Sequence, residues 1–263
     1  MKKLVYILLV FASLNTYAQK NLIKFEDKDG LFGYKDSLKN VIVYPKYTIA
    51  SVFNQGLALV ATNKGWNIID HTGKELTDFT GTPKFSYNEY INYEFIAIKK
   101  NEKWGFIDRK GNLLIPYQYE EVEDFNMGIA PVKIGELWGF INTDNELIIK
   151  PTYEKVTIFY DGLAGFYENG KWGFINGNNE VVIEPKYTSI TLFSEGLCAV
   201  NTLDFNAMGG GITNEVINKK GEIVFTGEFW AFTPYKNGVA SYWEGYDFRG
   251  KHIFIDRNGK RIK

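Results

Sequence analysis

The sequence predicts an all-β protein, a tandem antiparallel β-repeat array of about seven copies. The phrase Trp-Gly-Phe-Ile, followed by Asp or Asn, recurs at Trp104, Trp138 and Trp172, and both intervals are 34 residues. A constant interval of this length is typical of repeat proteins, because one short unit cannot bury its own faces and must stack on its neighbours. The segments alternate as strands do, and none combines a 3.6-residue period with helix caps.

Each copy is expected to contain three or four short strands. In the third copy they fall at residues 104–108 and 113–115, at a weaker segment 119–125, and at residues 129–133. The first alternates large and small residues, and the second is an apolar triplet of β type. Six copies and a truncated seventh account for one repeat domain over residues 19–263.

An acidic or amide residue closes each phrase and is expected to open a tight hairpin turn. These anchor residues are Asp36, Asp70, Asp108, Asn142, Asn176, Asn218 and Asp256. Three positions later, four copies carry glycine and two carry Asn145 and Asn179, and both residue types accept a positive φ. Acidic residues in a row could also suggest the paired carboxylates of a glycoside hydrolase. Because three copies replace Asp with Asn, and a turn accepts either residue, the pattern favours turns.

Four shared segments resemble the bacterial WG repeat, a family named for its Trp-Gly pair. They are the phrase itself, the turn glycine, Ile-Pro-x-x-Tyr at residues 115–119, and Phe-x-x-Gly-x-Ala-x-Val at residues 125–132. The resemblance covers about residues 22–263 and is strongest in the third to fifth copies. The end copies keep the Trp-Gly pair in part or not at all, as capping repeats do. The resemblance implies an all-β repeat domain of mostly unassigned function, and it supplies no catalytic residues.

The number of copies and of strands favours a propeller-like closed form over an open β-solenoid. Two features oppose closure. An interval of 34 residues is short for a propeller blade, and the last copy stops at Ile262 without its fourth strand. Residues 22–25 form a strand of the first copy and do not replace the missing one.

Residues 1–18 are expected to be a secretory signal peptide. Met1-Lys2-Lys3 is basic, residues 4–14 are apolar except for Ser13, and Thr16 and Ala18 are small residues at the cleavage positions. The apolar run is too short for a permanent membrane span; the alternatives are a buried N-terminal helix and a retained anchor. We therefore expect a mature chain that begins near Gln19, without a later membrane span, in the periplasm, on the outer surface or outside the cell.

Charge and cysteine content limit the partners and the redox chemistry. The chain has 30 Lys and Arg residues against 31 Asp and Glu residues, a net charge of −1, without a block of like charge. The basic patch that nucleic-acid binding requires is therefore missing. The single cysteine, Cys198, aligns with alanines of other copies, so a small buried apolar side chain is expected there; the alternative is a reactive or intermolecular thiol.

No motif predicts catalysis, a metal or a cofactor. Of the two histidines, His71 lies in a hairpin turn and His252 takes the place of a repeat tryptophan. No His or Cys spacing matches a metal site, and the Gly-rich segment 208–211 lacks the Lys-Ser/Thr pair of a phosphate-binding loop. The protein is therefore expected not to be an enzyme.

Two insertions predict a binding edge. The copies lengthen around residues 204–211 and 243–250, at the same hairpin of neighbouring copies. Insertions on one edge often mark the binding face of a repeat protein. The alternative is that end copies simply tolerate longer loops, whose rings cover the end of the core. The candidate binding residues are Asp204, Phe205, Met208, Trp243, Tyr246, Phe248 and Arg249.

The expected function is binding or scaffolding to a protein or a glycan of the cell envelope, without chemistry. The alternative is an envelope hydrolase that acts on glycans through acidic residues interpreted here as turn caps. A strip of Trp104, Trp138 and Trp172 could also bind carbohydrate, but rings that recur with the packing phrase are expected to pack between repeats. The oligomeric state stays open.

Overall fold

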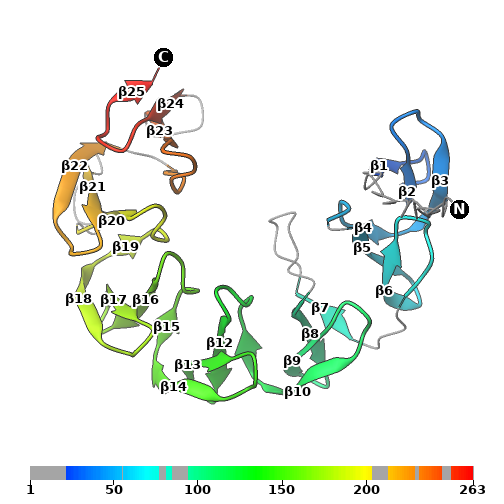
Figure 1. Ribbon diagram of the computed structural model, residues 1–263, viewed down its shortest axis with the longest axis horizontal. Helices are drawn as coiled ribbons and strands as arrows, with labels where there is room; N and C mark the ends of the chain where they lie inside the picture. The colour runs from blue at the N-terminus through cyan, green and yellow to red at the C-terminus, as the bar shows by residue number, and fades with distance from the viewer. Residues whose placement is uncertain are drawn as a thin grey trace, which may run out of the picture. The chain divides into compact units, whose positions relative to one another are not determined.

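The computed structural model describes residues 22–54, 56–76, 81–84, 94–202, 213–228, 231–244 and 250–262 (Figure 1). Within these ranges the chain forms strands and no helix, and the strands make seven antiparallel sheets. The prediction of an all-β repeat array is confirmed. The chain divides into two compact units, Met1–Thr80 with Ser86–Ile91 and Gly81–Phe85 with Asn92–Lys263.

The first unit contains two three-stranded sheets. Their strands are β1 (Ile23–Glu26), β2 (Phe32–Lys35) and β3 (Val41–Tyr47), then β4 (Ile49–Ala50), β5 (Leu57–Thr62) and β6 (Gly65–Asp70). One apolar core lies between the two sheets, and it includes Tyr34 and Val43 from the first sheet and Ala58 and Ile69 from the second.

The second unit contains five sheets, and in each the strands follow one another in chain order. The first two sheets are β7 (Thr82–Pro83), β8 (Ile96–Lys100), β9 (Lys103–Ile107) and β10 (Leu113–Tyr119), then β11 (Glu121–Val122), β12 (Ile129–Ile134), β13 (Leu137–Asn142) and β14 (Leu147–Tyr153). The next two are β15 (Lys155–Val156), β16 (Leu163–Glu168), β17 (Lys171–Asn176) and β18 (Val181–Tyr187), then β19 (Ser189–Ile190), β20 (Leu197–Asn201), β21 (Thr213–Asn218) and β22 (Ile223–Glu228). The last is β23 (Ala240–Glu244), β24 (Lys251–Ile255) and β25 (Arg261–Ile262).

The boundary between sheets falls inside the weak strand that the sequence predicted at residues 119–125. Tyr119 ends β10, whereas β11 at Glu121–Val122 pairs with β12 and opens the next sheet. One sheet therefore combines the end of one sequence copy with the phrase of the next. This arrangement links neighbouring copies through hydrogen bonds as well as through apolar contacts.

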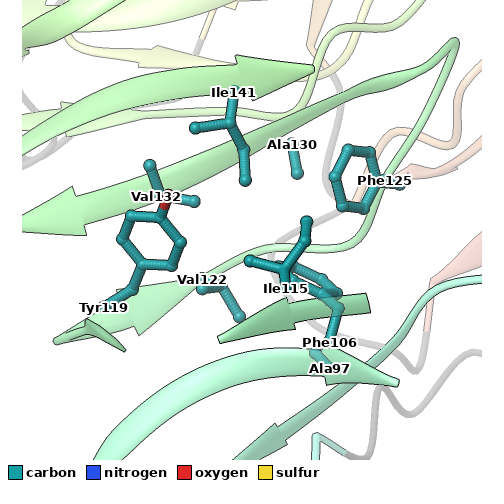
Figure 2. Close-up of a cluster of buried hydrophobic side chains, with 9 residues drawn as sticks. All are labelled: Ala97, Phe106, Ile115, Tyr119, Val122, Phe125, Ala130, Val132 and Ile141. Atoms are coloured by element: carbon teal, nitrogen blue, oxygen red, sulfur yellow. The ribbon is translucent and has the colours of Figure 1, made fainter. Parts of the chain in front are cut away.

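In the second unit each sheet except the last packs one face against the next sheet along the chain. We call this face the forward face and the opposite one the rear face. Figure 2 shows the first such interface, in which side chains of β9 and β10 meet those of β12 and β13. The side chains involved include Phe106, Ile115 and Tyr119 on the forward face and Ala130, Val132 and Ile141 on the rear face.

The phenylalanine of each phrase lies at the centre of these interfaces. Phe106, Phe140 and Phe174 are at most 1% exposed. Each makes an edge-to-face contact with a second phenylalanine from the following loop, and the ring centroids are 4.8–4.9 Å apart in the pairs Phe106–Phe125, Phe140–Phe159 and Phe174–Phe193. Such pairs contribute about 0.5–1.5 kcal/mol beyond the buried area.

The repeat tryptophans pack at the margin of the same interfaces. Trp138 is 9% exposed, and Trp104 and Trp172 are half-buried against the apolar clusters. The expectation that the tryptophans pack between repeats is therefore confirmed, although the phenylalanine two positions later is more deeply buried.

The anchor residues cap hairpin turns in all seven copies. In each, the Oδ1 atom accepts hydrogen bonds from the backbone N–H groups two and four positions later, as Asp108 does from Lys110 and Asn112 at 2.7 and 2.8 Å. The same pair of bonds forms at Asp36, Asp70, Asn142, Asn176, Asn218 and Asp256. The fourth turn residue has a positive φ, including Asn145 at 65° and Asn179 at 63°. The turn-cap interpretation is confirmed.

We expect Asp108→Ala to lower the free energy of unfolding by about 1 kcal/mol, because two backbone N–H groups lose their acceptor. Asp108→Asn should cost less, since it keeps the Oδ1 atom. Burial raises the pKa of the Asp108 carboxyl, but the hydrogen bonds from Asn112 and the backbone outweigh it and place the pKa below its ordinary value. The charged carboxylate therefore stabilises the fold above about pH 4, and this contribution is lost as the pH falls.

Urea unfolding of the wild type, Asp108→Ala and Asp108→Asn at neutral pH and near pH 3 checks this prediction. The wild type should have a higher free energy of unfolding than Asp108→Asn at neutral pH, and this difference should disappear in acid, because the asparagine does not titrate. A difference in free energy of unfolding that is the same at both pH values would show that the carboxylate charge has no role in the turn.

Cys198 occupies the buried slot that its alignment with alanines predicts. Its side chain is 1% exposed, and its Sγ atom donates a hydrogen bond to the carbonyl oxygen of Thr191 at 3.1 Å. Burial raises the pKa of the thiol from 9.0 to about 12, although the bonds to Thr191 act against this shift. Because the folded pKa is the higher one, the thiol stabilises the fold fully below about pH 9 and loses this contribution as the pH rises.

Iodoacetamide should therefore label Cys198 at least about a thousandfold more slowly in the folded protein than in denaturant, since the thiolate fraction falls tenfold for each pKa unit. Mass spectrometry of timed samples measures both rates. Comparable rates in the two states would restore the alternative of a reactive thiol.

The preference for a closed ring over an open β-solenoid stays a prediction.

Candidate binding surface of the C-terminal sheet

The two insertions fall in equivalent hairpins of the last two sheets. The hairpin joining β12 to β13 has two residues, Gly135 and Glu136, and so has the hairpin joining β16 to β17. The corresponding connection between β20 and β21 spans residues 202–212, and that between β23 and β24 spans residues 245–250. Equivalent hairpins lie at the same edge of successive sheets, so the topology agrees with the predicted location of both insertions.

Six of the seven candidate binding residues lie outside the described residues. They are Asp204, Phe205, Met208, Tyr246, Phe248 and Arg249. The seventh, Trp243, lies near the end of β23, one residue before the base of the second connection. The structure therefore describes one of the predicted residues, Trp243, and the ends of the strands that the two connections join.

Trp243 belongs to a row of three aromatic side chains on the forward face of the last sheet. It faces His252 across the β23–β24 pair, and the two rings stack with centroids 4.9 Å apart and planes 18° apart. The ring of His252 in turn lies 4.8 Å from that of Phe254. We call Trp243, His252 and Phe254 the aromatic row.

Among the described residues, the polar side chains beside the aromatic row are hydrogen-bonded or paired with one another. The Nε2 atom of His252 lies 3.0 Å from the hydroxyl of Ser241, which shares the forward face. Glu244 forms an ion pair with Arg261, and both side chains are about half exposed. Since side chains alternate along a strand, Glu244 lies on the opposite side of β23 from Trp243. The row can therefore offer apolar and ring contacts and little hydrogen bonding.

Phe254 sets this surface apart from every other forward face. It occupies the phenylalanine position of the phrase and is 48% exposed, whereas Phe106, Phe140 and Phe174 are 0–1% exposed. Its cross-strand partner Ile262 is 43% exposed. The last described sheet thus exposes to about half their extent two side chains that the other sheets bury in a packing interface.

A family model with the description WG containing repeat matches residues 32–66, 104–138, 138–172 and 172–203, which is more than half of the chain. The chain belongs to the WG-repeat family. The third to fifth copies, which carry the complete phrase, account for most of the match. No match was found among curated protein sequences.

The WG-repeat sheets resemble those of solved WD40-like propeller structures. The Kluyveromyces lactis Hsv2p structure matches with a TM-score of 0.52 and 9% identity over 89% of this chain and 92% of that one. Saccharomyces cerevisiae Sqt1 matches with a TM-score of 0.50 and 12% identity over 93% and 82% of the two chains. A eukaryotic initiation factor matches with a TM-score of 0.52, 11% identity and coverages of 93% and 84%. At these identities the likeness shows the fold alone.

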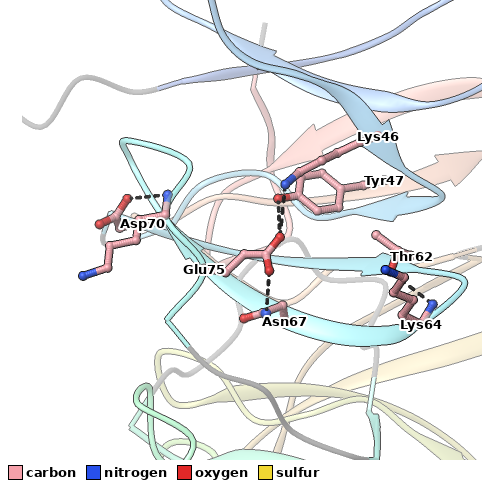
Figure 3. Close-up of polar contacts among 8 residues, drawn as sticks. Lys46, Tyr47, Thr62, Lys64, Asn67, Asp70 and Glu75 are labelled. Carbon is pink, nitrogen blue, oxygen red and sulfur yellow. Dashed lines mark hydrogen bonds and ion pairs between the residues drawn. The ribbon is translucent and has the colours of Figure 1, made fainter.

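The acidic residues that could have formed a pair of catalytic carboxylates make structural contacts instead. Besides the turn anchors, Glu75 of the first unit gathers several donors (Figure 3). Its carboxylate accepts hydrogen bonds from Lys46 and Asn67 at 3.1 Å and from the hydroxyl of Tyr47 at 3.4 Å. Within the described ranges, no group of three or more His, Cys, Asp and Glu side chains could hold a metal ion.

In the described part of the chain, no helix is long and apolar enough to cross a membrane.

The sequence pattern did not predict Phe254, Ile262 and His252 as parts of a surface. In the interior copies the phrase phenylalanine pairs with a phenylalanine of the following loop, and the given sequence shows no such loop after Phe254 that could have signalled a buried position. His252 in place of the repeat tryptophan was noted, but its stacking on Trp243 depends on the register of β23 and β24.

Proposed function

We propose that this WG-repeat protein is an exported, non-catalytic protein that binds a protein or a glycan of the bacterial cell envelope, as a receptor or a scaffold. The observation that carries the proposal is the pair of long connections at equivalent hairpins of neighbouring sheets, with the aromatic row beside the base of the second. Repeat proteins commonly bind through loops that extend from one edge of the array. Aromatic side chains at such an edge suit the anchors of a binding interface.

The recurring residues of each repeat have structural roles, and this supports binding over catalysis. The recurring residues are committed to structure: the phenylalanines fill interfaces, and the Asp and Asn anchors cap turns. The equivalent hairpins differ most in length at the two connections. Export rests on the signal-peptide pattern of residues 1–18, and it would place the binding surface outside the cytoplasm.

A cross-linked pull-down from native envelopes tests this function. The bait is the mature protein, compared with a variant in which the connections at 202–212 and 245–250 are each replaced by the Asn169-Gly170 hairpin of the fifth copy. A matched control replaces Gly135-Glu136 with Asn-Gly, which alters an equivalent hairpin without an insertion. We expect a specific partner that the wild type and the control capture and the trimmed variant loses.

Two results would count against the proposal. Equal capture by the trimmed variant would remove the connections from the binding surface. Hydrolysis of envelope glycans by the purified wild-type protein would favour the alternative of a hydrolase. Circular dichroism of each variant confirms that a lost partner does not reflect a lost fold.

A further inference from the structure

The forward face of the last sheet repeats a packing surface that the chain uses elsewhere. In interior sheets the phrase phenylalanine pairs across the strands with an aliphatic residue, as Phe140 does with Ile149 and Phe174 with Ile183. These four side chains are at most 5% exposed. The equivalent pair in the last sheet is Phe254 and Ile262, which are 48% and 43% exposed.

The rear face of the first sheet also exposes an apolar side chain at a position that is buried in the other sheets. Five other rear faces carry a small residue opposite an isoleucine, as in Ala164 with Ile175 and Ala240 with Ile255, and the rear face of the third sheet pairs Ile96 with Ile107. These six residues are at most 2% exposed. In the first sheet the equivalent pair is Ile23 and Lys35, and Ile23 is 49% exposed. The first sheet thus exposes an apolar side chain at a rear-face position that the other sheets bury.

We propose that the forward face of the last sheet binds the rear face of the first sheet of a second copy of this chain. The interface continues one that the chain already builds, since forward faces meet rear faces between every pair of successive sheets in the second unit. Phe254 and Ile262 supply the forward pair, and Ile23 supplies the apolar rear position. Burying these side chains is favourable because it removes apolar surface from water.

The departures from the repeat pattern fit this partner. Ile23 is larger than the alanine or cysteine at this position in most sheets, and it matches Ile96 of the third sheet, whose side chain is buried in a rear face. Lys35 replaces an isoleucine, and its Nζ atom lies 5.4 Å from the ring centroid of Phe25. A lysine held over one ring can also meet the aromatic row of the other copy, because ammonium groups are attracted to ring faces.

The stacking within the aromatic row favours a sheet over a sugar as the occupant. A sugar platform offers an open ring face, whereas Trp243 and His252 direct faces toward each other at 4.9 Å. The side chains of Phe254 and Ile262, which are 48% and 43% exposed, are the ones that an apolar surface would cover. The proposed contact joins two different faces, so it is head-to-tail, and successive copies would form a chain or a ring.

Sedimentation velocity at increasing protein concentration tests the contact through two complementary variants. Phe254→Glu disables the forward face and keeps the rear face, and Ile23→Glu does the reverse. We expect the wild type to associate with rising concentration and each variant alone to sediment as a monomer. An equimolar mixture of the two variants should form a heterodimer, because one intact forward face and one intact rear face remain.

Met127→Glu serves as the matched control, because Met127 is an apolar residue that is 66% exposed and lies on neither face. It should associate like the wild type, and thermal unfolding should show all three variants folded. A wild type that stays monomeric at every concentration would overturn the proposal, including the case in which the ring closes within one chain. A mixture that stays monomeric would overturn the head-to-tail pairing.

Discussion

Replacing Gly139 with alanine is expected to lower the free energy of unfolding by at least about 2 kcal/mol, the range of an overpacked core. A Cβ atom at this position would lie 2.5 Å from the carbonyl oxygen of Ile149 and 2.8 Å from the backbone nitrogen of Pro151. Both atoms belong to the backbone of β14, so they cannot turn aside as a flexible side chain could. Urea unfolding of the variant measures the loss.

Gly177→Ala is the control for the loss of glycine itself, because a Cβ atom there would meet no atom within 4 Å. This substitution should change the free energy of unfolding by less than about 1 kcal/mol, and a small gain is possible through the unfolded state. Equal losses in the two variants would show that backbone freedom, and not the approach of β14, explains the repeat glycine.

The strand register shows why the glycine belongs to the repeat. Between β13 and β14 the register shifts on both sides of Phe140, and this irregularity brings the β14 backbone over Gly139. In the sixth copy Glu215 stands at the glycine position, and it pairs with Thr226 in a register that is regular from Thr213 to Val216. The glycine is therefore required where the following strand bulges.

The sequence predicted the local features of the fold best. Turn capping by Asp108 or Asn142 depends on residues up to four positions away, so the pattern alone was sufficient. The sheet boundary after Tyr119 was not predicted, because a weak two-residue strand acquires its partner only when the next copy folds beside it. The bulge that demands Gly139 likewise involves two strands, and no single-strand pattern reveals it.

The candidate binding surface was predicted only in part for the same reason. Trp243 was identified because it adjoins an insertion, a feature that can be counted along the chain. Phe254 looks like any other phrase phenylalanine in the sequence, and only the structure shows that its ring is 48% exposed. The exposure of a side chain depends on which other residues pack against it, and the identity of the residue alone does not reveal this.

The same repeat position should therefore tolerate truncation in one copy and not in another. Phe140→Ala is expected to lower the free energy of unfolding by about 3–5 kcal/mol, because it removes a fully buried ring and leaves a cavity. The ring also loses its edge-to-face partner Phe159, whose centroid lies 4.9 Å away. Denaturant unfolding followed by tryptophan fluorescence measures the change.

Phe254→Ala removes the same side chain from the equivalent position of the last sheet, where the ring is 48% exposed. Under conditions in which the protein is monomeric, its cost should stay below about 1.5 kcal/mol, since about half of the ring already contacts water. At concentrations that favour association the cost should grow, because the ring would then be buried against a second copy. If Phe254→Ala lowers the free energy of unfolding of the dilute monomer as much as Phe140→Ala does, Phe254 is covered within its own chain. The forward face of the last sheet would then not be a binding surface.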